Sequence, residues 1–253
     1  MTAEQIEMVK SLLPTSLGSS EAREAFASEI LRQSVWSARM ESARYLAQVR
    51  EVCAAVASGE YNLADARMRL QRTLSNLGYD VAGAQGIQNP ASRRRLDLIV
   101  KTRTEMAANA ARVNAQDEAS VYAVPAWELL RFGTRRVPRD WAARWKAAGD
   151  AVGWTGASRD FGTRIALKDS PIWQALGDGA GGYRDTLGNP YPPFAFSSGM
   201  AWAGVERDEC IRLGLIGEHE RPKVPPRVGV GPTSEELAES VQRAGMDVAR
   251  GLE

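Results

Sequence analysis

Hydrophobic side chains recur at helical spacing through the first third of the chain. Residues 21–57 contain no Pro or Gly, and their apolar positions recur at steps near three and four, or sums of these, at Phe26, Ile30, Met40, Val49, Cys53 and Val56. This spacing predicts one long amphipathic helix that ends at Gly59. Asn62 then caps a second predicted helix, whose stripe is Leu63, Ala66, Leu70, Leu74 and Leu77 and whose stop is Gly78.

Residues 21–80 are therefore predicted to form a helical hairpin, preceded by a short N-terminal arm at residues 1–20. Its apolar stripe is more simply a core than a partner-binding face. A glycine-containing linker at 78–91 precedes a third predicted helix from Arg93 to about Asn114. One face of that helix carries Leu96, Ile99, Met106, Ala110 and Val113.

The pattern changes after Gln116. Six of the seven tryptophans and most prolines and glycines follow it. We expect short strands at 121–124 and 163–168 and short helices at 142–151 and 207–213. Residues 92–220 are thus predicted to be a compact, loop-rich α+β core. Residues 221–253 are predicted to be a Pro-rich arm with a terminal helix at 234–250, opened by a capping box of Thr233 and Glu236. The predicted fold class is α+β, predominantly α.

Composition limits the classes of protein. The 253 residues are 44% hydrophobic and 25% charged, as in folded globular proteins, and the formal net charge is +1. Overall charge therefore predicts neither nucleic-acid nor membrane binding. No stretch approaches the ~20 apolar residues of a membrane span, and the first residues lack the pattern of a signal peptide. We expect synthesis and assembly in a cytoplasm and no membrane partner.

Residues for catalysis or metal binding are sparse. Two cysteines, Cys53 and Cys210, and the single His219 exclude a disulfide scaffold and a two-histidine metal site. Gly177, Gly179 and Gly182 match G-x-G-x-x-G formally, but no strand precedes them and no helix follows, which favours a loop. His219 fits a solvated surface position and Cys210 a buried one. The sequence predicts no catalytic residue, metal or cofactor, although scattered carboxylates could still meet in space.

Basic residues gather in two places. The first cluster begins with Arg93, Arg94 and Arg95 and continues with Lys101 and Arg103. The second is opposed only by Asp140 and contains Arg131, Arg135, Arg136, Arg139, Arg144 and Lys146. Such clusters can neutralise DNA phosphates, pair with an acidic partner, or simply face solvent. Both are candidate sites of DNA or partner contact.

Three ordered stretches carry a family resemblance. Residues 98–116 contain a Thr/Arg/Glu cluster, a run of small residues and an Arg, with Arg103, Asn109 and Arg112 among them. Residues 168–173 end in Trp173. Residues 191–196 contain Pro192, Pro193 and Phe196, and Trp202 follows. Together they resemble the phage Mu F-type head morphogenesis family, the minor head proteins of tailed bacteriophages. The resemblance spans about residues 20–215, and the turns at 59–63 and 77–79 are similar to the family's helical leader.

The resemblance implies a structural, non-enzymatic virion protein. It would act in head assembly near the portal, within a homo- or hetero-oligomeric assembly in the virion head, built in the host bacterial cytoplasm. Its partners would be the portal and/or the major capsid protein, with packaged DNA as a further candidate. The matching residues Arg103, Asn109, Arg112, Trp173, Pro192, Pro193, Phe196 and Trp202 would have structural roles.

Departures from the family pattern concern a metal site. Many members carry a His near the position of Trp141 here, and a Cys-x-Cys where this chain has residues 196–200 without cysteine. No metal site is therefore transferred. We hypothesise that apolar packing by Trp141, Trp145 and Met200 takes its place.

Three other functions remain open at this stage. A head–tail connector or adaptor would form rings, a DNA-binding virion protein delivered with the genome would bind duplexes in a salt-dependent manner, and an enzyme would need a cleft with convergent polar groups. The last helix is a docking element for a partner groove or a surface helix folded onto its own domain.

Overall fold

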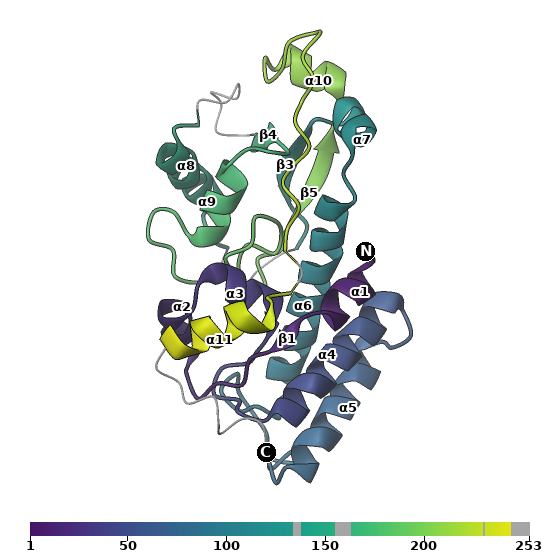
Figure 1. Cartoon of the computed structure of the whole chain (residues 1–253), viewed down its shortest axis with the longest axis vertical. Helices are drawn as coiled ribbons and strands as arrows, with labels where there is room; N and C mark the ends of the chain where they lie inside the picture. Colours follow the sequence, from purple (N-terminus) through teal and green to yellow (C-terminus); the bar gives the residue numbers. More distant parts are fainter. Residues whose placement is uncertain (134–137, 155–162, 230, 244–253) are drawn as a thin grey trace. The chain divides into compact units, whose positions relative to one another are not determined.

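The chain divides into two compact units in the computed structural model (Figure 1), which describes residues 1–133, 138–154, 163–229 and 231–243. Unit 1 comprises Met1–Ala111 together with Gly229–Glu253, and unit 2 comprises Arg112–Val228. The described residues form eleven helices, a two-stranded sheet and a three-stranded sheet. The expected α+β, predominantly α fold class is confirmed. Within the described ranges, no helix is long and apolar enough to cross a membrane.

Unit 1 is built on a helical hairpin. Helix α4 (Ala43–Ser58) is capped at its C-terminus by Gly59, which has a φ of 84°. Helix α5 (Leu63–Asn76) is capped at its N-terminus by Asn62, whose side chain accepts hydrogen bonds from amides of the first turn. Helix α6 (Arg93–Asn114) follows with the predicted bounds. The three helices enclose one aliphatic core, which includes Leu46, Val49, Val52, Leu70, Leu74, Leu96 and Val100.

The single long helix expected at 21–57 is wrong. The segment forms α2 (Ser19–Ala25), α3 (Ser28–Gln33), the strand β2 (Ser34–Val35) and only then α4. Backbone at Ala27 and Ser34 is extended, and Arg39 has a φ of 55°. The stripe misled because its residues serve two cores. Phe26 packs in a second cluster with Leu13, Ala22 and Leu31, whereas Val49 belongs to the hairpin core.

The N-terminal arm is folded rather than loose. It contains α1 (Ala3–Met8), which packs against α4, and β1 (Ser11–Leu12), which pairs in parallel with β2. Ile6 and Leu13 are fully buried. Residues 1–20, which the sequence predicted to be a separate arm, thus contribute to the core of unit 1.

The C-terminal helix α11 (Ser234–Arg243) belongs to unit 1 and folds onto it. This is the second of the two arrangements expected from the sequence, a surface helix folded onto its own domain. Leu237 and Val241 pack against the cluster around Phe26, and α11 contacts α3. The capping box at Thr233 and Glu236 is present. Just before the helix, a side chain at Gly231 would meet the Val9 carbonyl oxygen at 2.6 Å, so the segment lies tightly on the N-terminal arm. Residues 244–250 of the expected helix lie outside the described residues.

Unit 2 contains an antiparallel sheet of order β4–β3–β5, formed by β3 (Ala126–Arg131), β4 (Ile165–Leu167) and β5 (Met200–Val205). The strand expected at 163–168 is confirmed as β4. The strand expected at 121–124 is wrong, because Asp117 caps a short helix, α7 (Glu118–Ala123), through the Ser120 amide. A local cap outweighs the β propensity of that apolar run.

Three further helices complete unit 2. Helices α8 (Trp141–Val152) and α10 (Arg207–Arg212) confirm the two expected short helices, and α9 (Ile172–Asp178) packs against α8. Gly177 lies in α9 against the backbone of Asn189, and Gly179 ends the helix with a φ of 80°. The G-x-G-x-x-G match therefore falls at a helix end and in a turn, which is not the strand–loop–helix arrangement that holds a dinucleotide.

Candidate functional site

An aromatic cluster forms the centre of unit 2. Trp127 of β3 and Trp202 of β5 stack with ring centroids 3.8 Å apart and planes 12° from parallel. The strand register explains this contact. Leu129 faces Trp202 directly, and Trp127 lies two residues from Leu129, so both indoles project from the same face of the sheet as a diagonal pair.

Trp173 of α9 joins this stack from the side. Its ring meets the rings of Trp202 at 5.1 Å and Trp145 at 5.3 Å, both edge-to-face. Its indole nitrogen donates to the Leu167 carbonyl of β4 at 2.8 Å, so the one polar atom of the ring is satisfied. Phe194 stacks on Trp173 at 6.2 Å. Residues from five separate segments thus meet in one cluster.

The residues predicted from the family resemblance divide between the two units. Within unit 2, Trp173 and Trp202 lie in the aromatic cluster, and Arg112 donates to the Trp202 carbonyl at 3.1 Å. Pro192 and Pro193 are buried, and Phe196 is half-buried. Arg103 and Asn109 belong to unit 1, where the Asn109 side chain donates to the Glu105 carbonyl of its own helix.

Two arginines of the second basic cluster share one carboxylate. Asp185 accepts from Arg139 at 2.6 Å and from Arg144 at 2.8 Å, and Arg139 also donates to the Phe196 carbonyl. The Arg144 guanidinium lies over the Tyr183 ring at 4.2 Å. Burial opposes ionisation of Asp185, but the two guanidinium groups outweigh it and lower the pKa of this carboxyl. The charges of Arg139 and Arg144 are therefore paired inside unit 2, where they stabilise its loops.

The other predicted contact residues have different environments. Arg131 is exposed and donates to the Arg139 carbonyl, and Lys146 pairs with Asp150 at 2.6 Å. Arg135 and Arg136 lie outside the described residues. In unit 1, Arg93 and Arg94 project into solvent, whereas Arg95 turns inward to Ser37 and to the carbonyls of Ala38 and Gln88, so Arg95 is structural.

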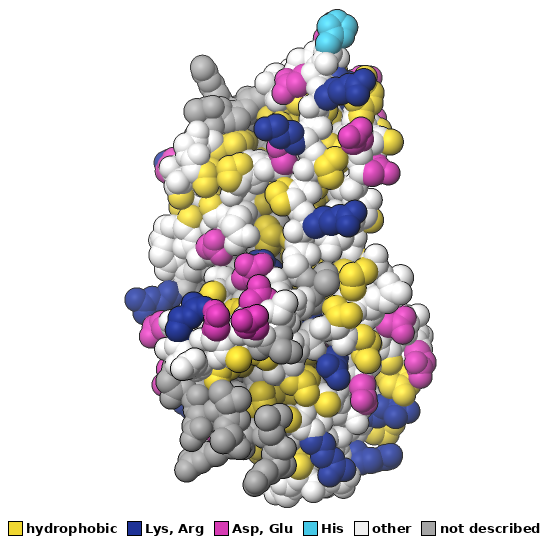
Figure 2. Space-filling model, in the orientation of Figure 1, with side chains coloured by type: hydrophobic (Ala, Val, Ile, Leu, Met, Phe, Trp, Pro, Cys, Tyr) yellow, Lys and Arg dark blue, Asp and Glu magenta, His cyan; other side chains and the backbone are white. Residues whose placement is uncertain are grey.

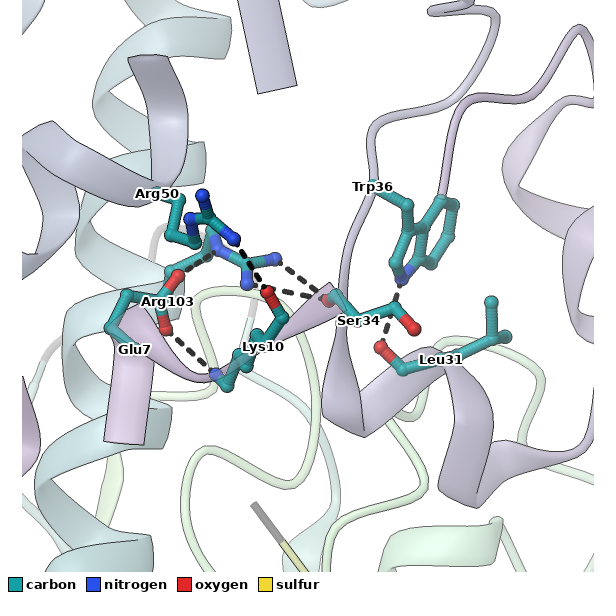
Figure 3. Close-up of polar contacts among 7 residues, drawn as sticks. All are labelled: Glu7, Lys10, Leu31, Ser34, Trp36, Arg50 and Arg103. Carbon is teal, nitrogen blue, oxygen red and sulfur yellow. Dashed lines mark hydrogen bonds and ion pairs between the residues drawn. The ribbon is translucent and has the colours of Figure 1, made fainter. Parts of the chain in front are cut away.

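A buried ion triad in unit 1 was not predicted from the sequence (Figure 3). Glu7 is fully buried and accepts from Arg103 of α6 at 2.6 Å and from Lys10 at 2.7 Å. Arg103 also donates to the Ser34 carbonyl of β2, and Arg50 of α4 donates to the Lys10 carbonyl. The triad therefore ties the N-terminal arm to α6, and the Arg50 hydrogen bond ties the same arm to α4.

Electrostatics make the triad dependent on its single carboxylate. Burial opposes ionisation of Glu7, but Arg103 and Lys10 together outweigh it and hold the pKa of Glu7 below its ordinary value. Burial, helped by repulsion from Arg103, also lowers the pKa of Lys10, although Glu7 opposes this. Nothing in the first ten residues marks Glu7 as buried, since its partner Arg103 is 96 positions away.

Lys168 is a buried cation of unit 2 that was not predicted as a site residue from the sequence. Its ammonium donates to the Gln116 side chain at 2.6 Å and lies 5.5 Å from the Trp127 ring centroid. Burial, together with repulsion from Arg112, lowers the pKa of Lys168 to about 8. The contact joins the chain after α6 to the end of β4 and so supports the aromatic cluster.

The proposed replacements for metal ligands are all packed in unit 2. Trp141, Trp145 and Met200 are buried, and Trp141 lies against Phe194 with centroids 6.4 Å apart.

Cys53 and Cys210 are buried thiols, and burial raises the pKa of each. Over the described ranges, no three His, Cys, Asp or Glu side chains are grouped so that they could hold a metal ion. His219 is exposed in a turn.

Comparisons with protein-family models, with characterised proteins and with solved structures find no match to this chain. The family resemblance consequently depends on the ordered sequence motifs alone.

Proposed function

We propose that this chain is a structural minor head protein of a tailed bacteriophage, acting in head assembly near the portal through binding rather than catalysis. One observation carries the proposal. Trp173 and Trp202, from two of the three stretches behind the resemblance, lie in one aromatic cluster. Arg112, from the remaining stretch at 98–116, donates a hydrogen bond to the Trp202 carbonyl. Motifs separated along the chain thus stabilise one fold, as expected where a family shares a structural role.

The engagement of the charged side chains supports a binding role. Arg139 and Arg144 are held by Asp185, and the Lys168 ammonium is held by Gln116. These groups stabilise loops and strand ends. Partner binding would then use exposed surface, such as the neighbourhood of Phe132, whose side chain is 73% exposed at the end of β3.

Co-purification with the portal protein of the same phage tests the proposal. The tagged chain is co-expressed with the portal and major capsid proteins, and the mass of the purified particle is measured in low and high salt. We expect a complex with the portal that survives high salt, because apolar contacts are not screened. A particle with a ring of this chain alone would favour a connector. No complex in either buffer would contradict the proposal.

Matched variants separate folding from docking. Trp202→Ala removes a buried ring of the cluster and should abolish the complex by unfolding unit 2. Phe132→Ala removes an exposed ring and should leave the fold of unit 2 intact. Weaker portal binding by Phe132→Ala would place the contact at this end of β3, and unchanged binding would place it elsewhere.

A further inference from the structure

A basic surface in unit 1 joins two helices that are far apart in sequence. It consists of Arg72 on α5 and Arg93, Arg94 and Lys101 on α6, named below the α5–α6 face. Arg67 of α5 and Asp97 of α6 form an ion pair at 2.8 Å, and Gln71 donates to the Ala91 carbonyl. These contacts bring the middle of α5 level with the start of α6.

Helix geometry turns these side chains outward. Leu70 and Leu74 of α5 and Leu96 and Val100 of α6 are buried in the hairpin core, which fixes the inner side of each helix. Arg94 and Lys101 are seven residues apart on the opposite side of α6, two turns or roughly 10 Å along its axis. Arg72, Arg94 and Lys101 are all exposed. Figure 2 shows Lys and Arg side chains gathered over the lower end of unit 1, where α5 lies in Figure 1.

The face keeps a positive balance. Asp97 is shared by Arg67 and Arg93, so one carboxylate serves two guanidinium groups, and Arg93 remains 76% exposed. Within the described part of the chain, Arg72, Arg94 and Lys101 take part in no ion pair. Glu105, one turn after Lys101, marks the end of the face. The side chains of Arg72, Arg94 and Lys101 can therefore bind a phosphate without breaking an ion pair.

The basic cluster at 131–146 lacks this freedom. Arg139 and Arg144 would have to leave Asp185, and Lys146 is paired with Asp150. Three of the four described cations of that cluster are therefore already paired within unit 2, whereas α5 adds an arginine to the first cluster.

We propose that the α5–α6 face binds the phosphate backbone of double-stranded DNA. Three of its four cations are arginines, whose planar guanidinium groups bind phosphate oxygens in pairs. Phosphate contacts carry no sequence information, so binding is independent of sequence. The proposal rests on the proposed head function for its setting. Its test uses the isolated protein, so its failure would leave the portal experiment unaffected.

The test measures binding of the purified full chain to a fluorescent duplex of random sequence, between about 50 and about 200 mM salt. The triple variant R72A/R94A/K101A should bind at least about tenfold more weakly in low salt. Its salt slope should fall by about 0.9 for each phosphate that the protein no longer neutralises. The variant R72K/R94K keeps the charge and should retain most of the affinity.

A matched control removes the same charge from unit 2. Arg221, Lys223 and Arg227 are all exposed, and R221A/K223A/R227A should bind duplex like the wild type. A loss confined to the α5–α6 variant, with its thermal unfolding unchanged, supports the proposal. Equal losses in both triple variants, no loss in either, or no binding by the wild-type chain would overturn it. So would an α5–α6 variant that binds duplex normally but no longer binds the portal.

Discussion

The two units build their interiors from different materials. Unit 1 buries aliphatic side chains along helix faces and includes the triad of Glu7, Lys10 and Arg103. Unit 2 buries tryptophans from a sheet and two helices, and a phenylalanine from a loop, around one centre. Many small contacts along regular elements support the first core, whereas a few large rings support the second. A single substitution in the core should therefore lower the free energy of unfolding most in unit 2.

The largest effect is expected for Trp173→Ala. Trp173 is 2% exposed and contacts the rings of Trp127, Trp145, Trp202 and Phe194. Its truncation leaves a large cavity and should lower the free energy of unfolding by about 3–5 kcal/mol. Urea denaturation followed by fluorescence measures this. Phe132→Ala is the control and should change stability by less than about 0.5 kcal/mol. A decrease below about 1 kcal/mol for Trp173→Ala would show that the core does not depend on these rings.

The second effect tests the triad of unit 1. Glu7→Ala leaves Lys10 and Arg103 buried without their carboxylate and should cost about 3 kcal/mol or more. The triple variant E7M/K10M/R103M removes all three charges and should recover most of that stability, because a buried triad contributes little net stability. If the triple variant is as unstable as Glu7→Ala, the triad is a net stabiliser and the comparison with unit 2 changes.

The same triad makes the stability of unit 1 dependent on pH. Because the pKa of Glu7 is lowered in the folded protein, the unfolded chain binds a proton there first as pH falls. The stabilisation from Glu7 is fully present above the pKa of an unfolded glutamate and is lost as pH falls through the folded pKa. Acid titration of stability should thus be steeper for the wild type than for E7M/K10M/R103M. Equal slopes would mean that Glu7 is not ionised in the folded protein.

The smallest effect concerns the C-terminal helix. Leu237 is half-buried against the cluster around Phe26, and Leu237→Ala should destabilise unit 1 by about 1 kcal/mol. Glu235→Ala, at an exposed position of the same helix, is the control. Limited proteolysis should release the C-terminal segment faster only in Leu237→Ala. Equal release in both variants would indicate that α11 does not depend on this contact.

Regular elements of both units could be predicted from the sequence. The bounds of α6, the cap at Asn62 and the capping box at Thr233 follow from residues a few positions apart. Residues 21–57 could not be assigned correctly, because Phe26 and Val49 fit one helical stripe although they pack in different clusters. Periodicity reports spacing and does not report which core a residue joins.

Prediction of the sites was limited by contacts between distant residues. Glu7 meets Arg103 across 96 positions, and Arg144 meets Asp185 across 41. From the sequence, Arg144 was therefore placed among candidate DNA or partner contacts, and Glu7 was not singled out. Trp173 and Trp202 were identified through the motifs, but their meeting with Trp127 depends on the register of β3 and β5. Charge patterns along a sequence say where cations lie, and the fold decides which are free.

The central claim, a structural role in the phage head, is tested most directly by quantitative mass spectrometry of purified heads. The amount of this chain is measured relative to the portal and major capsid proteins of the same particles. We expect a fixed, low ratio to the portal that persists after washing in high salt. Heads that lack the chain, or that lose it in proportion to salt, would contradict a structural role in the virion head.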